Sequence, residues 1–143
     1  MKLEEIGFYT LTDDRAKNSC LHSPLWRNEI IITSRCNFKC PYCRGTDIDG
    51  VKNADMPLNE IKKIIDILAA ENVKNIRLSG GEPSIHKNII EIVEYIKKAC
   101  EHIERIAIST NGYSEIKLYK KLIDCGVNDY SISLDACCYS VGS

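Results

Sequence analysis

The chain has 143 residues, which is long enough for one folded domain with a hydrophobic core. Its 19 basic and 20 acidic residues nearly cancel, so the charge pattern argues against a nucleic-acid partner without excluding a structured RNA. No apolar run is long enough to cross a membrane and the charged N-terminus does not resemble a signal peptide, so we expect a cytoplasmic protein with no membrane partner. In such a protein, eight cysteines favour metal ligands or free thiols over disulfides.

Strand and helix patterns alternate along most of the chain. Residues 1–27 show no regular period and are interpreted as an N-terminal extension, followed by a core domain over 28–143. Short β-branched runs predict strands over 29–33, 73–78, 103–108 and 127–134. Apolar residues three and four positions apart predict helices over 58–71, with Asn59 as N-cap, 88–98 and 115–124. This order predicts an α/β fold of parallel strands joined by right-handed helical crossovers.

Three cysteines, Cys36, Cys40 and Cys43, follow the first predicted strand directly. Thiolates on one short loop can converge on a single metal centre, and a cubane iron–sulfur cluster held by three cysteines leaves one iron without a protein ligand. The alternative is a structural zinc module, because Cys40 and Cys43 form a C-x2-C pair. Zinc usually takes two such pairs or a pair with two histidines, and no second pair with that spacing follows.

Polar motifs also end the other three predicted strands. They are Ser79-Gly80-Gly81-Glu82-Pro83, Ser109-Thr110-Asn111-Gly112 and Ser133-Leu134-Asp135-Ala136. The paired glycines permit close backbone approach, and a carboxylate such as that of Glu82 can hold an ammonium group. Because parallel strands present their carboxyl ends at one rim, we expect all four motifs to surround a single site.

The cysteine spacing, with aromatic Tyr42 inside it, resembles the signature of the radical S-adenosylmethionine (radical SAM) superfamily, and Gly80-Gly81-Glu82-Pro83 resembles its GGEP motif. The resemblance implies a partial parallel (β/α) barrel, with about four units present and so truncated relative to the usual six-unit core. It implies that Cys36, Cys40 and Cys43 bind a 4Fe-4S cluster whose open iron binds S-adenosyl-L-methionine. Reductive cleavage would then give a 5'-deoxyadenosyl radical that abstracts hydrogen from an unknown substrate.

The same resemblance assigns the contacts to S-adenosylmethionine. They are Tyr42, Gly80, Gly81, Glu82, Ser109, Asn111 and Ser133. Within the superfamily the motifs resemble the GTP 3',8-cyclase and peptide-modifying branch most, which implies a substrate contact at Arg77. Glu29 stands where the cyclase has a substrate-binding arginine and the second C-terminal cluster is absent, so the assignment stops at the superfamily.

The resemblance leaves the catalytic side chains and the reaction product unassigned. It implies a small-molecule or peptide substrate and a reductant such as flavodoxin or ferredoxin. One alternative is a non-catalytic iron–sulfur-binding fragment that needs a missing C-terminal half or a partner. The adjacent Cys137 and Cys138 receive no role.

Overall fold

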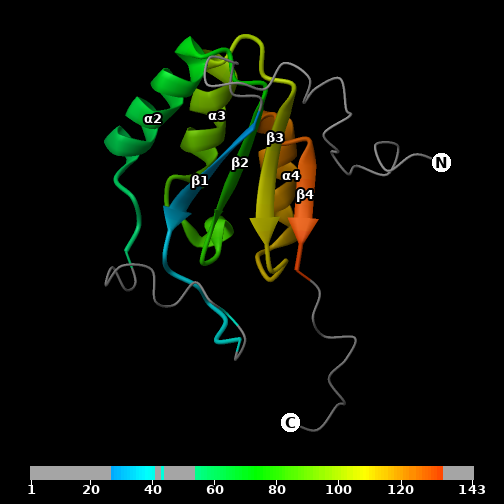
Figure 1. Ribbon diagram of the computed structural model, residues 1–143. Coiled ribbons are helices and arrows are strands. Elements are labelled where there is room, and N and C mark those ends of the chain that lie inside the picture. The colour runs from blue at the N-terminus through cyan, green and yellow to red at the C-terminus, as the bar shows by residue number, and fades with distance from the viewer. Residues whose placement is uncertain (1–26, 41–42, 44–53, 134–143) are drawn as a thin grey trace, which may run out of the picture.

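The computed structural model describes residues 27–40, 43 and 54–133. Its centre is a sheet of four parallel strands whose order follows the sequence: β1 (Arg27–Thr33), β2 (Asn75–Gly80), β3 (Arg105–Thr110) and β4 (Asp129–Ile132). The crossovers contain α2 (Leu58–Ala70), the 3-10 turn η3 (Pro83–Ile85), α3 (Ile89–Ala99) and α4 (Ile116–Cys125). These helices lie together on one side of the sheet (Figure 1). The predicted α/β fold with parallel strands and helical crossovers is therefore confirmed.

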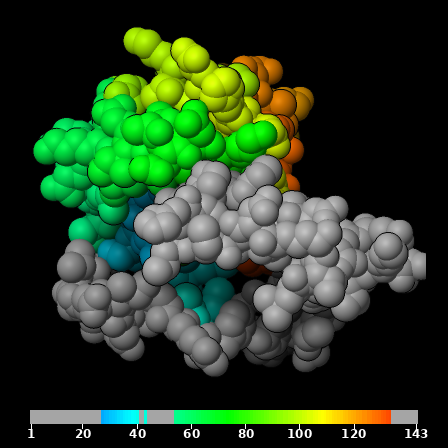
Figure 2. All heavy atoms as spheres, turned by 45° about the horizontal axis from the view of Figure 1, so that its top comes forward, coloured from blue at the N-terminus to red at the C-terminus, as the bar shows by residue number. Residues whose placement is uncertain are grey.

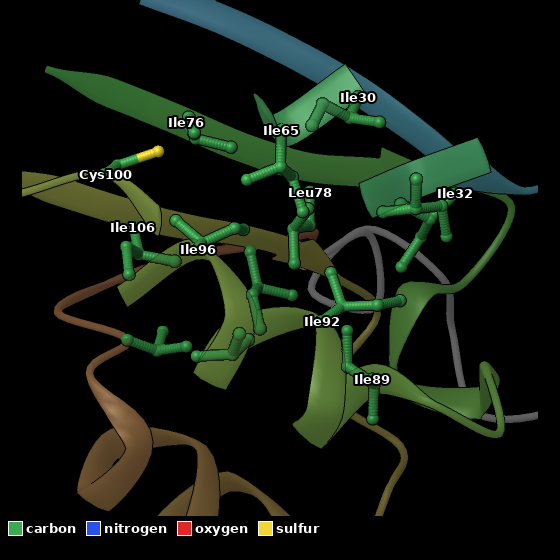
Figure 3. Packing of buried hydrophobic residues seen from close by; sticks show 14 of the residues in the cluster. Ile30, Ile32, Ile65, Ile76, Leu78, Ile89, Ile92, Ile96, Cys100 and Ile106 are labelled. Atoms are coloured by element: carbon green, nitrogen blue, oxygen red, sulfur yellow. The ribbon is translucent and has the colours of Figure 1, made fainter. Parts of the chain in front are cut away.

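Alternating burial along the strands separates the two faces of the sheet. Ile30 and Ile32 are almost completely buried, whereas Glu29 and Ile31 between and beside them are exposed. The buried strand residues meet apolar residues of α2 and α3, as Figure 3 shows for Ile30, Ile32, Ile65, Ile76, Leu78, Ile89, Ile92 and Ile96. The opposite face carries the residues in register with Glu29 and Ile31, among them Arg77 and Ser79. One face therefore forms the core, and the other is more polar.

The helices follow the predicted apolar spacing. Buried Ile61, Ile65 and Leu68 lie along one side of α2. Helices α2 and α3 contact each other, and Figure 2 shows them side by side on the surface of the molecule. In the part of the chain that the structure describes, no helix is both long and apolar enough to cross a membrane.

Two local predictions are wrong for physical reasons. Helix α2 begins after Pro57, whose φ of −58° already suits a helix, and Asn59 lies inside the helix instead of capping it. The second, third and fourth strands begin two residues later than predicted. Val73 and Val127 are buried, but their N–H groups bond to Leu68 and Leu122 in the preceding helices. Such an apolar residue closes a helix end instead of opening a strand.

The core packing makes a testable prediction about Ile92, which is fully buried on α3. We expect Ile92→Ala to lower the free energy of unfolding by about 2–5 kcal/mol, because it leaves a cavity among closely packed side chains. Ile67→Ala is the matched control, since Ile67 is 64% exposed on α2. Urea unfolding measures both variants, and equal losses would contradict this description of the core.

Candidate functional site

The ends of β1 and β2 are joined by backbone hydrogen bonds that continue beyond the sheet. The N–H of Gly81 donates to the carbonyl of Thr33 at 2.8 Å, and the N–H of Glu82 donates to the carbonyl of Arg35 at 2.8 Å. The segment that enters the cysteine loop therefore runs beside the Gly-Gly-Glu turn. The structure brings the first two predicted motifs together, as expected for neighbouring parallel strands.

Both glycines are required by this close approach. A Cβ atom at Gly80 would lie 2.0 Å from the carbonyl oxygen of Thr33, and one at Gly81 would lie 2.1 Å from that of Arg35. Gly80 also has a φ of 137°, which side-chain-bearing residues rarely adopt. Any larger residue at either position would push the start of the cysteine loop away from β2.

The Glu82 side chain joins the turn after β2 to the end of β3. It is 1% exposed, and its Oε1 accepts hydrogen bonds from the N–H of Ser84 at 3.0 Å and from the hydroxyl of Thr110 at 2.7 Å. Its Oε2 accepts one from the N–H of Asn111 at 2.6 Å. A buried carboxylate with three donors fixes two neighbouring turns relative to each other. Its predicted contact with S-adenosylmethionine stays a prediction.

The turn after β3 contacts the cysteine loop directly. The Nδ2 of Asn111 donates to the Oδ1 of Asn37 at 2.8 Å. The rings of Phe38 and Tyr113 also meet edge to face, with centroids 5.4 Å apart. The third predicted motif therefore lies at the same rim as the first two.

The three cysteines of the loop are free thiols, with Cys36 and Cys43 exposed and Cys40 half-buried. The N–H of Phe38 donates to the sulfur of Cys36 at 3.3 Å, and the N–H of Cys43 donates to the carbonyl of Cys40 at 3.1 Å. Within residues 27–40, 43 and 54–133, no three His, Cys, Asp or Glu side chains are grouped around a point as metal ligands would be. The loop thus supplies three reachable thiols of the type that iron–sulfur clusters require.

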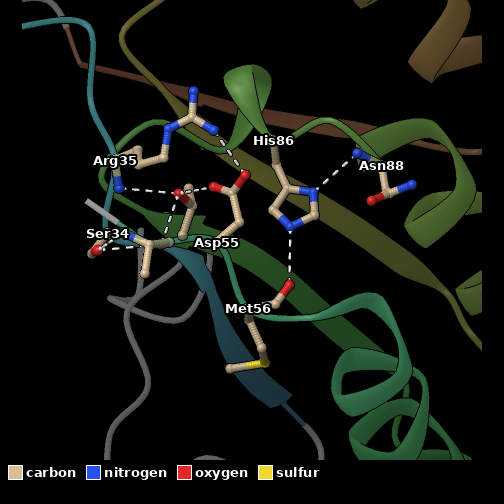
Figure 4. A network of polar contacts seen from close by, with 8 residues as sticks. Ser34, Arg35, Asp55, Met56, His86 and Asn88 are labelled. Carbon is tan, nitrogen blue, oxygen red and sulfur yellow. Dashed lines mark hydrogen bonds and ion pairs between the residues drawn. The ribbon is translucent and has the colours of Figure 1, made fainter. Parts of the chain in front are cut away.

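A polar network holds both ends of the cysteine loop (Figure 4). Asp55 accepts hydrogen bonds from the hydroxyl of Thr33 at 2.7 Å and from the guanidinium of Arg35 at 2.8 Å. The backbone of the same segment also pairs with the end of β1, since the N–H of Ser34 donates to the carbonyl of Ala54. The loop therefore leaves and returns at one fixed place.

His86 supports the returning segment from the other side. Its Nδ1 accepts a hydrogen bond from the N–H of Asn88 at 3.1 Å, so its Nε2 carries the proton and donates to the carbonyl of Met56 at 3.2 Å. The ring is 2% exposed. An imidazole that is hydrogen-bonded through both ring nitrogens at this position is a structural group.

The pKa of Asp55 reflects this network. Burial by itself raises the pKa of the carboxyl, but the hydrogen bond from Thr33 and the positive charge of Arg35 outweigh it and hold the pKa below its usual value of 3.8. The charge of His86 nearby lowers the pKa of the carboxyl as well. The folded protein therefore favours the ionised carboxylate.

The remaining predicted site residues lie on or beside the strands. Ser109 is half-buried on β3, and Ser133 is exposed just after β4, where its N–H donates to the carbonyl of Thr110 at 2.9 Å. Arg77 lies in register with Glu29 on the face away from the helices. Its Nε atom is buried and has no hydrogen-bond partner within the described residues. Tyr42, Cys137 and Cys138 lie outside the described residues.

Sequence analysis missed Asp55, Thr110 and His86 as parts of this site. Asp55 and His86 lie outside the recognised motifs, and their roles depend on contacts between distant segments. Thr110 was visible within the Ser-Thr-Asn-Gly motif, but only the structure shows its hydroxyl bonded to Glu82. For Thr110, its place in a polar motif after the predicted strand was the only feature of the sequence that indicated a role in the site.

Comparison with known proteins identifies the class to which this arrangement belongs. The chain matches the sequence model of the radical SAM superfamily over residues 30–139. The protein is therefore a member of the radical SAM superfamily, a family of enzymes that generally use a 4Fe-4S cluster and S-adenosylmethionine. The family prediction is confirmed.

Among curated relatives, the GTP 3',8-cyclase of Mannheimia succiniciproducens is 37% identical over 107 residues, which cover 73% of this chain and 32% of that protein. The GTP 3',8-cyclase of Rhizobium meliloti is 32% identical over 109 residues, which cover 74% and 31%. The chain thus matches about a third of the length of these relatives.

Solved structures show the same fold. BtrN in complex with AdoMet and 2-DOIA is similar with a TM-score of 0.66 and 23% identity, covering 74% of this chain and 44% of that one. BtrN in an open conformation has a TM-score of 0.64 and 24% identity, covering 77% and 50%. The likeness to these structures agrees with the predicted partial parallel (β/α) barrel.

The Asp55 network predicts a pH-dependent contribution to stability. A lowered folded pKa means that this contribution is complete above the unfolded pKa and is lost as the pH falls through the folded value. We expect Asp55→Asn to lower the free energy of unfolding by about 1–2 kcal/mol at pH 7, with the difference from the parent protein shrinking below about pH 4. Urea titrations over this pH range test it, and Asp124→Asn, exposed on α4, is the control. A difference that does not change with pH would contradict the role of Asp55.

The close packing at Gly81 makes a separate prediction. Gly81→Ala should destabilise the protein by about 1–3 kcal/mol, because the added Cβ atom overlaps the backbone of the cysteine loop. Gly112→Ala is the control: its φ of 75° adds strain, but among the described residues the nearest neighbour of the new Cβ would be a side-chain atom of Ile132 at 3.4 Å. In thermal unfolding, Gly81→Ala should therefore have a lower melting temperature than Gly112→Ala. The reverse order would show that the loop does not depend on this contact.

Proposed function

We propose that this chain is a radical SAM enzyme domain in which Cys36, Cys40 and Cys43 bind a 4Fe-4S cluster. The observation that carries the proposal is the pair of backbone hydrogen bonds that fixes the cysteine loop against the Gly-Gly-Glu turn. The donor set fits, because three free thiols lie on one loop and cluster irons take thiolate ligands. When bound, the cluster supplies the electron that cleaves S-adenosylmethionine to methionine and a 5'-deoxyadenosyl radical, which abstracts hydrogen from a substrate.

The protein's part in this chemistry is to bind and orient. Glu82 fixes the turns after β2 and β3, and its carboxylate already accepts three hydrogen bonds. The exposed backbone of Gly80 and the half-exposed backbone of Gly81 therefore remain accessible to the methionyl end of S-adenosylmethionine. Ser109, Asn111 and Ser133, at the ends of the next two strands, complete the proposed binding site.

The substrate would approach the face of the sheet that the helices leave open. Arg77 lies on this face, and its buried Nε has no hydrogen-bond partner among the described residues, which supports a role in holding an acceptor group of a small molecule or peptide. The electron would come from a reductant such as flavodoxin or ferredoxin. The match covers about a third of the length of the curated relatives, and the alternative proposal is an iron–sulfur-binding fragment without turnover.

Anaerobic reconstitution with iron and sulfide tests the cluster. We expect about four irons per chain and a low-temperature EPR signal after reduction. Replacing Cys36, Cys40 or Cys43 by serine should each abolish the signal, whereas Cys125→Ser, at the end of α4 and outside the loop, should not. Retention of the full cluster in any of the three loop variants would contradict the three-ligand assignment. Zinc without sulfide would favour the zinc module.

Adding S-adenosylmethionine to the same samples separates enzyme from fragment. A changed EPR signal, with 5'-deoxyadenosine formed under dithionite, is the result expected for the enzyme. A cluster EPR signal that does not change when S-adenosylmethionine is added would favour the non-catalytic fragment.

A further inference from the structure

Two N–H groups face the sulfur of Cys36 from different parts of the chain. The backbone N–H of Phe38 donates to it at 3.3 Å, and the Nδ2 of Asn111 lies 4.0 Å away, a long contact that is still in range for sulfur. We propose that Asn111 is a positioning residue that donates a hydrogen bond to the Cys36 thiolate and thereby raises the reduction potential of the cluster. This inference rests on the proposed function and is distinct from the contact with S-adenosylmethionine predicted for Asn111.

The orientation of the Asn111 amide follows from its neighbours. Its Oδ1 accepts a hydrogen bond from the N–H of Tyr113 at 3.1 Å. A flipped amide would put its NH2 group against that donor, so Nδ2 must face the cysteine loop. Nδ2 carries two hydrogens, and only one is used at 2.8 Å by the Oδ1 of Asn37. The second hydrogen is available to Cys36.

The position of Asn111 is fixed by the buried carboxylate of Glu82. That carboxylate holds the backbone N–H of Asn111 at 2.6 Å and the hydroxyl of the preceding residue, Thr110, at 2.7 Å. The edge-to-face contact of Phe38 with Tyr113 holds the same turn against the loop on the other side of Asn111. The donor therefore stays close to the sulfur without help from a ligand.

A negative charge on the sulfur of Cys36 would strengthen this contact. The thiol of Cys36 lies 4.0 Å from the Oδ1 of Asn37, to which only an S–H group can donate. A thiolate has no proton to donate to that oxygen, which still accepts the hydrogen bond from Asn111, and the second amide N–H of Asn111 then faces a negative charge. Hydrogen bonds to the sulfurs of a cluster stabilise its more negative, reduced form and so raise its potential. Removing the donor must lower the potential.

The test compares reconstituted proteins by EPR-monitored redox titration without S-adenosylmethionine. Asn111→Leu removes the donor at similar size, and Asn111→Asp replaces the amide with a carboxylate that has no N–H. Both variants should show a midpoint potential more negative than that of the parent protein, with Asp the lower because of its charge. The Asp variant serves if the Leu variant does not take up iron.

Asn128→Leu is the matched control. Its side-chain amide accepts a hydrogen bond from the N–H of Ile106 and donates one to the carbonyl of Glu104. These bonds link the start of β4 to β3, at the opposite end of the strands from the cysteines. This control should lose stability and keep the parent potential. Equal potentials in the parent protein and in an Asn111 variant that holds the cluster would overturn the inference, and so would an equal shift in Asn128→Leu. Absence of a cluster from the parent protein would refute the proposed function itself.

Discussion

The arrangement depends on the close contact between two backbones at the ends of β1 and β2. Carbonyl groups of Thr33 and Arg35 occupy the space that Cβ atoms at Gly80 and Gly81 would fill. This contact sets where the cysteine loop begins, and Asp55 sets where it returns. In the proposed function the loop holds three ligands on one metal centre, which favours fixed ends because each freely moving residue adds to the entropy lost on binding.

The Gly-Gly-Glu-Pro motif therefore has a structural part that its short sequence does not show. Its glycines receive the cysteine loop, and its glutamate reaches the other way to the end of β3. One turn thus holds two other loops in position. The Glu82 side chain that contributes to this is almost inaccessible to solvent. Changes at this turn would disturb the loops on both sides, so a loss of function there does not by itself demonstrate a contact with a ligand.

Much of this architecture could be predicted because periodic patterns report directly on burial. The spacing of Ile61, Ile65 and Leu68 fixed α2, and β-branched runs located every strand within two residues. The meeting of the strand-end motifs at one rim followed from the parallel topology. The partners of Glu82, Asp55 and His86 could not be predicted, since each depends on side chains from segments about 20–30 residues apart. The start of β2 was predicted too early, at Val73, because an apolar residue that closes a helix looks the same in sequence as one that begins a strand.

The strand order has a consequence for how the protein is made. Because each strand pairs with the one synthesised just before it, every added crossover can dock on a surface that already exists. The sheet can therefore grow one strand at a time as the chain is synthesised. The cysteine loop is the exception, because it is synthesised before β2 and β3, whose ends hold it in place. Metal delivery that waits for those strands would meet an organised loop instead of three loose thiols.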